Sequence, residues 1–525
     1  MKRTNQLTIF TLTCIGALFA SSTKFIDSQL LPKWFLMTGG LLLIGYYSII
    51  CFLINPNKKK QDSKTSQSYA TIIICTILIQ AAYGILQYIE ILPSTSAFQV
   101  SGSFDNPAGF AASLCGGFPF CILKITQTKG KIRWIFIVTF ILVITAIIIS
   151  ESRAGILSVI IVLSYWINRH IQPSLKIKNI LFPVLILGII AGLYYYKKDS
   201  ANGRLLIWKC SMPLLKKNLL TGGGTGTFEA HYMDYQAVYF KKHPDDSYSM
   251  LADNVQYPFC EYLNIGVNYG IIGLCIIFCV ILGISWCYYK DQTLEKEAAF
   301  LCWSTISIFA LFSYPLMYPF VWLVLSYSTY LLIHKLANKL YLSKSAKRSI
   351  AFILIMGLTY IGIQIFHRLK AEIEWKKISV LSSTGKTEEV LPRYKDVYSY
   401  LKTDRYFLYN YSIELYQVER YQESLFIALQ CRKYWADYEI EILFGALYEH
   451  LQQPEKAEKH YQWASYMCPN RFMPLYRQAR LLVKEKRLAE AKQIAKKIIN
   501  KPEKVRSPTI SIIKREMNDL VNQEY

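Results

Sequence analysis

The chain has 525 residues, of which 53% are hydrophobic, and its net charge is +23. Its mean hydropathy of +0.22 is unusually high for a soluble protein of this length. The positive side chains cluster beside apolar runs, so we interpret the charge as a signal of membrane topology and expect no nucleic-acid partner.

Apolar runs of about 17 to 24 residues recur as far as about residue 366, and about 20 such residues cross a hydrocarbon core as a helix. The runs are uniformly apolar, which predicts helices and not a barrel. We therefore predict an all-α fold, a polytopic membrane protein with about 11 transmembrane helices and a C-terminal α-helical repeat domain. The expected spans are 7–22, 33–54, 69–92, 107–125, 132–150, 154–168, 177–197, 262–289, 297–313, 316–335 and 350–366.

Basic residues mark the side of the membrane on which each connection lies. Short positive loops remain in the cytoplasm, which predicts a cytoplasmic N-terminus. The opposite side receives the loop 93–106, the turn around Arg153, the long loop 198–261 and everything after about His367. An odd number of spans makes the C-terminal domain external, and an error of one span would place it in the cytoplasm. The basic residues of the predicted cytoplasmic connections are Lys58, Lys59, Lys60, Lys64, Lys129, Lys131, Arg133, Arg169, Lys176, Lys178, Lys335, Lys339, Lys344, Lys347 and Arg348.

After a helical linker at 367–404, residues 405–525 contain a repeat of about 33 residues, in segments 405–437, 438–470 and 471–502. Each segment predicts two helices, with a break near Tyr421-Gln422, Pro454-Glu455 or Arg487-Leu488. Ala457 and Ala489 are expected at matching positions where two helices approach closely. The pattern resembles the tetratricopeptide repeat, with a generic helical bundle as the alternative. Such a stack offers a concave surface to a protein partner.

Two short motifs precede predicted spans on the external side. In Ser101–Phe110, Asn106 and Pro107 suit a helix start, and Gly102 and Gly109 favour a close backbone approach. Arg153 lies in the very short turn 151–155. The alternatives are a plain cap at Asn106 and an arginine whose charged end merely reaches the membrane surface.

The long loop 198–261 contains Arg204, Trp208 and a glycine cluster at Thr221–Phe228 that includes Gly223 and Gly226. Such a cluster can expose backbone N–H groups to a phosphate, although a flexible connector would look similar. It lacks the lysine and spacing of a Walker A loop, so we reject nucleotide hydrolysis. Basic residues in this loop would suit a diphosphate-bearing lipid, and the loop also carries two histidines; these residues are Lys209, Lys216, Lys217, Lys241, Lys242, His231 and His243.

The motifs GSFDNPAGF, SRAG, GR followed by W, GGGTGTF and EYLNIGVNYGIIG together resemble the O-antigen ligase family over about residues 95–285. Its relatives are O-antigen polymerases and bacterial O-oligosaccharyltransferases. The resemblance implies that residues 1–366 form a transmembrane O-antigen ligase-like domain in the bacterial cytoplasmic (inner) membrane, among membrane lipids. It implies transfer of a saccharide from an undecaprenyl-diphosphate carrier to lipid A–core, a protein hydroxyl or another carrier-linked glycan. No cofactor and no metal site are expected.

By motif, the resemblance implies that Arg153 and Arg204 contact the diphosphate, and that Gly102, Asn106, Gly223 and Gly226 shape the substrate site. Many family members have a His-Asn pair where this chain has Phe259-Cys260. The general base is therefore left open among Glu261, His231 and Asp253, and an enzyme without a base is also conceivable. The missing histidine is the best argument for a noncatalytic scaffold. A transporter is disfavoured because the spans have no clear internal repeat.

Overall fold

The computed structural model describes residues 2–54, 63–94, 96–170, 192, 198–337 and 343–523. Over these residues the chain forms helices and no strand, which confirms the all-α fold class. The chain divides into two compact units. Unit 1 comprises Met1–Tyr195, Phe259–Tyr262 and Cys275–Ile373, and unit 2 comprises Tyr196–Pro258, Leu263–Leu274 and Glu374–Tyr525.

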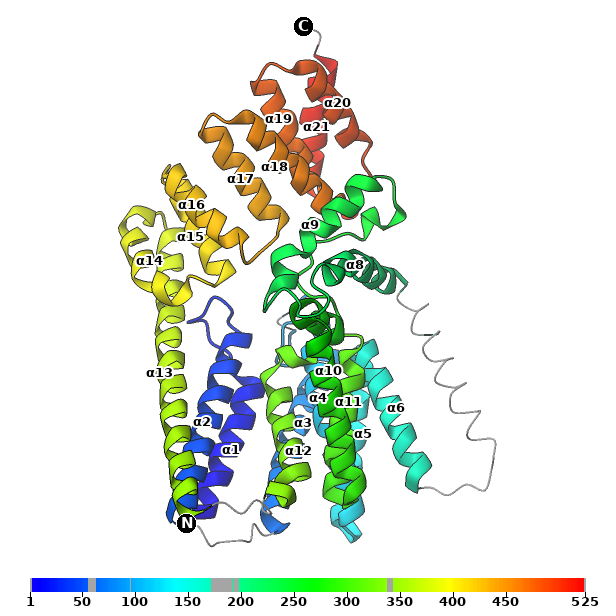
Figure 1. Ribbon diagram of the computed structural model, residues 1–525. Coiled ribbons are helices and arrows are strands. Elements are labelled where there is room, and N and C mark those ends of the chain that lie inside the picture. The colour runs from blue at the N-terminus through cyan, green and yellow to red at the C-terminus, as the bar shows by residue number, and fades with distance from the viewer. Residues whose placement is uncertain are drawn as a thin grey trace. The chain divides into compact units, whose positions relative to one another are not determined.

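The apolar helices of unit 1 coincide with the predicted spans (Figure 1). Ten of the eleven expected spans each fall on a helix, and the expected span 177–197 lies outside the described residues except at Gly192. The helices are α1 (Lys2–Phe19), α2 (Leu30–Ile54), α3 (Ser63–Tyr88), α4 (Pro107–Gln127), α5 (Gly130–Ile149), α6 (Arg153–His170), α10 (Glu261–Lys290), α11 (Leu294–Ala310), the short η2 (Pro315–Met317), α12 (Pro319–Ala337) and α13 (Lys344–Ser383).

Six helices among the described residues are long and apolar enough to cross a membrane, namely α2, α3, α4, α5, α10 and α13. Thr4–Phe19 and Pro319–His334 are shorter apolar helices. The chain is thus a polytopic α-helical membrane protein, while the total of about 11 spans stays a prediction. Of the ten predicted spans that fall on described helices, α6 and α11 belong to neither group.

The core of unit 1 is built around α4. Residues 109–124 of α4 are all buried, and small residues let neighbouring helices approach it. A Cβ atom on Gly117 would lie 2.7 Å from the Ile77 side chain. Close packing of this kind joins membrane helices, because lipid is as apolar as the side chains. By contrast, Phe352 and Ile353 on α13 are 65% and 67% exposed, as expected for a lipid-facing helix.

Unit 2 combines the loop between α6 and α10 with the C-terminal helices. The loop contributes α8 (Lys198–Lys217), α9 (Thr227–Lys242) and the short η1 (Ser247–Met250). The C-terminal part contributes α14 (Thr387–Leu401), α15 (Arg405–Gln417), α16 (Tyr421–Arg432), α17 (Tyr438–His450), α18 (Pro454–Met467), α19 (Met473–Lys484), α20 (Leu488–Asn500) and α21 (Pro508–Asn522).

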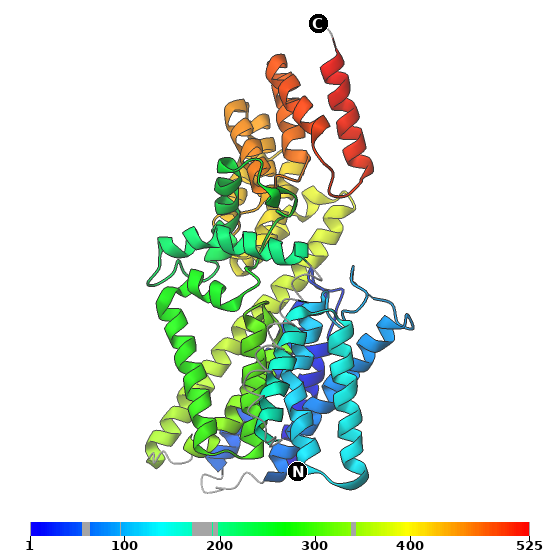
Figure 2. The ribbon, with the colours of Figure 1, turned by 90° about the vertical axis from the view of Figure 1, so that its right-hand side faces the viewer.

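The helices α15 to α20, yellow to orange-red in Figure 2, form three consecutive pairs, each joined by the same tight turn. Glu419, Gln452 and Lys486 adopt positive φ angles of 61°, 55° and 59° in these turns. The following amide in each turn donates to a carbonyl five residues earlier, as in a Schellman motif; the pairs are Arg420 to Leu415, Gln453 to Tyr448 and Arg487 to Leu482. The turns recur after 33 and 34 residues (452 − 419 and 486 − 452), close to the period seen in the sequence.

One predicted packing position in these pairs is wrong. Ala457 is fully buried as expected, but Ala489 is exposed and Ala491 is buried in its place. Ala457 and Ala491 are each the fourth residue of their helix, α18 and α20. Because side-chain direction follows the position along the helix, the match must be counted from the helix start.

Candidate active site

The start of α4 is held by Asn106 in unit 1. The Asn106 Oδ1 atom accepts hydrogen bonds from the backbone N–H groups of Ala108 and Gly109 at 2.9 and 3.1 Å. It also accepts a bond from the Tyr318 hydroxyl at 2.9 Å. The predicted helix cap is therefore confirmed, and the cap is tied to the chain just before α12.

The turn before Asn106 depends on Gly102. Its φ angle is +58°, its N–H donates to Gln87 Oε1 at 2.7 Å, and a Cβ atom would lie 2.3 Å from the Phe110 ring. At Gly109, a Cβ atom would lie 2.5 Å from the Tyr318 ring. The close approach predicted at these glycines is therefore to aromatic side chains of the protein itself.

Glu261 meets the same region of unit 1 from the start of α10. Its side chain is buried, and Oε1 accepts a hydrogen bond from the Leu316 N–H at 3.1 Å. Since Tyr318 bonds Asn106, the segment 314–318 connects Asn106 with Glu261. Sequence reasoning missed this segment, although its two Tyr-Pro pairs, Tyr314-Pro315 and Tyr318-Pro319, were a visible signal. Tyr314 also packs against Phe259, with ring centroids 5.4 Å apart.

Arg153 is the first residue of α6 and is half-buried. It follows Glu151, whose φ angle is 53°, so the chain reverses sharply between α5 and α6. The guanidinium therefore adds its charge to the partial positive charge of the helix N-terminus. This combination suits an anionic group such as a diphosphate.

In unit 2, the glycine cluster is locked into a break in α10. The break lies at Gly270, whose φ and ψ angles are 63° and −158°. Gly223 and Gly224 donate their N–H groups to the carbonyls of Val267 and Asn268 at 3.1 and 2.9 Å. In return, the carbonyls of Leu219 and Leu220 accept bonds from Ile271 and Ile272 at 2.9 and 3.2 Å. The loop thus supplies partners for the backbone groups that the break leaves open.

This lock changes the interpretation of the glycines. The N–H groups of Gly223 and Gly224 bond to carbonyls of α10, so these two groups do not face a phosphate, while the predicted role of Gly223 in shaping the substrate site stays a prediction. Gly226, with a φ angle of 85°, immediately precedes α9. The first N–H of α9, from Thr227, donates to Asn268 Oδ1 at 3.0 Å. The sequence does not reveal this role of Asn268, because Thr227 lies 41 residues away from it in the chain.

Arg204 and Trp208 lie one turn apart on α8. Arg204 is half-buried, and the Trp208 indole N–H donates to the Pro258 carbonyl at 3.0 Å. Pro258 ends the loop segment of unit 2. The bond therefore fixes the helix that carries Arg204 to the end of the loop.

His231 lies at the surface of α9. Partial desolvation lowers the pKa of its imidazole below the usual value, Asp234 opposes this effect, and the charges of Arg432 and Lys217 add to it. His231 is therefore neutral at pH 7 and able to accept a proton.

Asp253 is engaged differently. Burial raises the pKa of its carboxyl, but the Asn254 N–H and the Arg471 guanidinium outweigh this and hold the pKa below its usual value. Arg471 lies 2.9 Å from Asp253 Oδ1, and Lys504 lies 4.0 Å from Oδ2. A carboxylate stabilised in this way is a weak proton acceptor, which argues against Asp253 as the base.

The nine predicted site residues are divided between the two units. Unit 1 holds Gly102, Asn106, Arg153 and Glu261, and unit 2 holds Arg204, Gly223, Gly226, His231 and Asp253. Residues 138–278, which contain all five proposed catalytic or diphosphate-binding groups together with the α10 break, match the family model described as O-antigen ligase; these groups are Arg153, Arg204, His231, Asp253 and Glu261.

Residues 138–278 are similar to the O-antigen ligase family. This match supports a membrane glycosyltransferase of the ligase or polymerase type and agrees with the resemblance in the motifs. No curated protein matches the chain. The matched region begins within α5 and ends within α10, and it includes the loop segment that belongs to unit 2.

Proposed function

We propose that the chain transfers a saccharide from an undecaprenyl-diphosphate carrier to lipid A–core or to a protein hydroxyl, at the external face of the bacterial cytoplasmic (inner) membrane. The observation that carries the proposal is the match to the O-antigen ligase family at residues 138–278, a region that contains Arg153, Arg204 and the structured loop. In the reaction, the bond from the anomeric carbon to the diphosphate breaks, the acceptor oxygen bonds to that carbon, and the diphosphate leaves with the electron pair.

The residues fit these demands as follows. Arg153 and Arg204 would stabilise the charge that develops on the leaving diphosphate. His231, neutral at pH 7, would take the proton of the acceptor hydroxyl. Glu261 is buried against the backbone of segment 314–318, so we assign it a positioning role. No step needs a cofactor.

The arrangement of unit 2 supports an external C-terminal domain. Residues 196–258 and 374–525 belong to one compact unit, and a unit with this many charged residues cannot be divided across a bilayer. The chain between Leu274 and Glu374 must then cross the membrane an even number of times, which the four helices α10 to α13 allow. The C-terminal domain would therefore lie on the side of the loop, whatever the number of spans before it.

We also infer that residues 405–525 are tetratricopeptide-like repeats. The support is the recurrence of the same left-handed turn at Glu419, Gln452 and Lys486.

Cells that lack the chain test the function directly. Their lipopolysaccharide and periplasmic glycoproteins should lose long glycan from one acceptor class, seen on gels stained for carbohydrate, and the native chain should restore it. A lipopolysaccharide ladder shortened to one repeat would identify a polymerase instead. Unchanged glycans in both classes, with redundant transferases removed, would contradict the proposal and favour a scaffold or transporter.

The choice of base gives a separate prediction. His231→Ala should lower kcat by about 10²- to 10⁴-fold, the usual contribution of a general base. Asp253→Asn should change kcat little, because an exposed ion pair contributes only about 0–1 kcal/mol. Since His231 acts when neutral and its pKa is lowered, native activity should decline with acid only below about pH 6.5. Equal kcat values for His231→Ala and the native chain would remove His231 from the mechanism.

A further inference from the structure

We propose that the C-terminal helix pairs hold the chain's own external loop in register for catalysis, with Arg432 as a positioning residue; this inference rests on the proposed function. The docked loop is defined here as residues 227–258, from the start of α9 to Pro258. It belongs to the same compact unit as α15 to α20, and α9 packs against α18.

Main-chain bonds fix the path of the docked loop. At several points, a backbone amide or a side-chain amide donates a hydrogen bond to a backbone carbonyl, and each of these bonds joins the docked loop to the C-terminal helices. Such bonds set the position of the backbone itself and do not depend on the loop side chains alone. They run from the Ala436 N–H to the Glu229 carbonyl at 2.9 Å, from Gln236 Nε2 to the Met467 carbonyl at 2.7 Å, and from Asn470 Nδ2 to the Ala252 carbonyl.

Arg432, at the end of α16, binds two residues on one turn of α9. Its Nη2 lies 2.6 Å from Asp234 Oδ1, and its Nη1 donates to the Ala230 carbonyl at 3.2 Å. Its Nε also pairs with Glu441 of α17 at 2.9 Å. Trp463 of α18 donates to the same Asp234 oxygen at 3.1 Å. A guanidinium has several N–H donors in one plane, so it can bind a carbonyl and two carboxylates at the same time.

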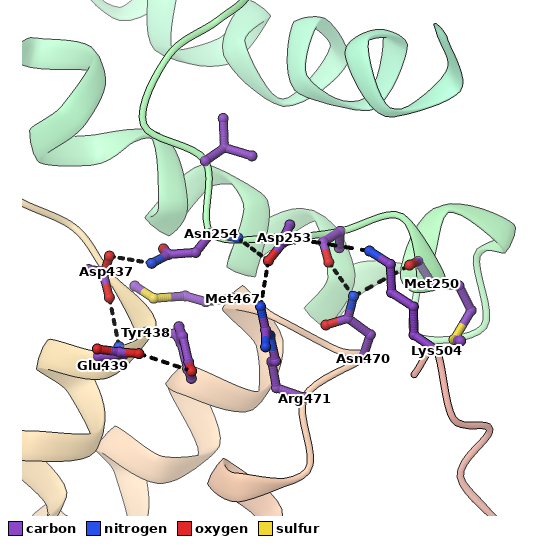
Figure 3. Close-up of polar contacts among 12 residues, drawn as sticks. Met250, Asp253, Asn254, Asp437, Tyr438, Glu439, Met467, Asn470, Arg471 and Lys504 are labelled. Carbon is purple, nitrogen blue, oxygen red and sulfur yellow. Dashed lines mark hydrogen bonds and ion pairs between the residues drawn. The ribbon is translucent and has the colours of Figure 1, made fainter. Parts of the chain in front are cut away.

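The far end of the docked loop also contacts the C-terminal helices, through an exposed ion pair and a side-chain hydrogen bond (Figure 3). Asp253 pairs with Arg471, and Asn254 donates its side-chain amide to Asp437. Asp437 is fully buried, and burial raises the pKa of its carboxyl to about 6. The loop therefore seals this part of the contact from water.

The contacts of Arg432 with α9 affect the proposed reaction because His231 lies on the same turn of that helix. It stands between Ala230 and Asp234, the two residues that Arg432 binds. The start of the same helix is bound by Asn268 at the break in α10. α9 is thus fixed at its first residue and along its exposed turn, and both contacts orient the imidazole.

The same contacts limit what the C-terminal helix pairs can recruit. The side chains of Arg432, Trp463 and Asn470 are engaged by the chain's own loop. A protein partner would have to bind a different part of these helix pairs, unlike the simple expectation for a recruiting repeat domain.

Arg432→Ala and Asp234→Ala, made in the full-length chain in nanodiscs, test the proposal because each removes one partner of the ion pair between α16 and α9. Each should lower kcat about 10- to 100-fold with an unchanged KM for the lipid-linked donor, because misplacement affects the reacting geometry. Amide hydrogen exchange in residues 227–242 should become faster in both. Asp234→Ala leaves the pair of Arg432 with Glu441 intact, so its effect cannot come from unfolding of α16 and α17.

The pH profile separates positioning from loss of structure. The charged groups that influence His231 are Asp234 on α9, Arg432 on α16 and Lys217 on α8. Arg432→Ala removes a charge that lowers the His231 pKa, so the acid limb should move to higher pH. Asp234→Ala removes the charge that raises it, so the limb should move to lower pH. A merely structural role would not move the two limbs in opposite directions.

Arg420→Ala is the matched control, because the Arg420 side chain, just before the helix that ends at Arg432, forms an exposed ion pair with Glu423. It should match the native chain in every measurement. Unchanged exchange in Arg432→Ala would overturn the proposal that the loop is held, and faster exchange with native kcat and pH profile would overturn the positioning role. An inactive native chain would instead contradict the proposed function, while the exchange data would still decide whether the loop is held.

Discussion

Gly270→Ala should lower kcat by about 100-fold or more, because it removes the break in α10 to which the glycine cluster is hydrogen-bonded. The φ and ψ angles of 63° and −158° lie in a region that only glycine occupies readily, and a side chain there costs about 1–3 kcal/mol. A Cβ atom would also lie 2.3 Å from the Leu220 carbonyl oxygen, which is backbone and cannot rotate away. The helix can relieve the strain only by releasing the loop.

The control for this change is in the same helix. A Cβ atom on Gly283 would meet nothing within 4 Å, and the residue is regular helix. Gly283→Ala should therefore keep full activity and lose no stability, since alanine favours helix more than glycine does. Thermal unfolding and transfer rates of both variants in detergent check the prediction. Native activity of Gly270→Ala would mean that the lock has no part in catalysis.

Arg204→Ala is the second change with a large expected effect. If the guanidinium stabilises the leaving diphosphate, kcat should fall about 10²- to 10³-fold, as when one electrostatic donor is removed from an active site. Arg204→Lys should recover only part of this loss, because an ammonium cannot bind two phosphate oxygens in a planar, bidentate way. Single-turnover rates with lipid-linked donor measure the effect.

Lys198, which is exposed on the first turn of the same helix, provides the comparison. Lys198→Ala removes a positive charge from α8 without altering the arginine, and it should keep the native rate. Equal losses in Arg204→Ala and Lys198→Ala would mean that only the overall positive charge of α8 matters.

The helices could be predicted from sequence because their signals are local. Uniform apolar runs of membrane length identify a span without knowledge of its neighbours. The cap at Asn106 and the repeat turns near Tyr421, Pro454 and Leu488 are likewise set by adjacent residues. The prediction for Ala489 is wrong because Ala489 lies two residues before Ala491, which is the residue that matches Ala457 when both are counted from the helix start.

The site was harder to predict because its contacts are distant in sequence. Arg471 meets Asp253 across 218 residues, and Tyr318 meets Asn106 across 212. Asp253 was a plausible base only while Arg471 was unknown. The glycines of the loop were recognised as unusual, but a glycine that binds phosphate and one that fits a broken helix have the same local sequence signal.

The most direct test is turnover by the purified full-length chain in nanodiscs, supplied with an undecaprenyl-diphosphate-linked glycan and with lipid A–core or an acceptor protein. Free undecaprenyl diphosphate and glycosylated acceptor should form in equal amounts, and Arg204→Ala should suppress both together. If the native chain forms neither product with any of these acceptors or with a second carrier-linked glycan, the assignment as a glycan transferase is contradicted.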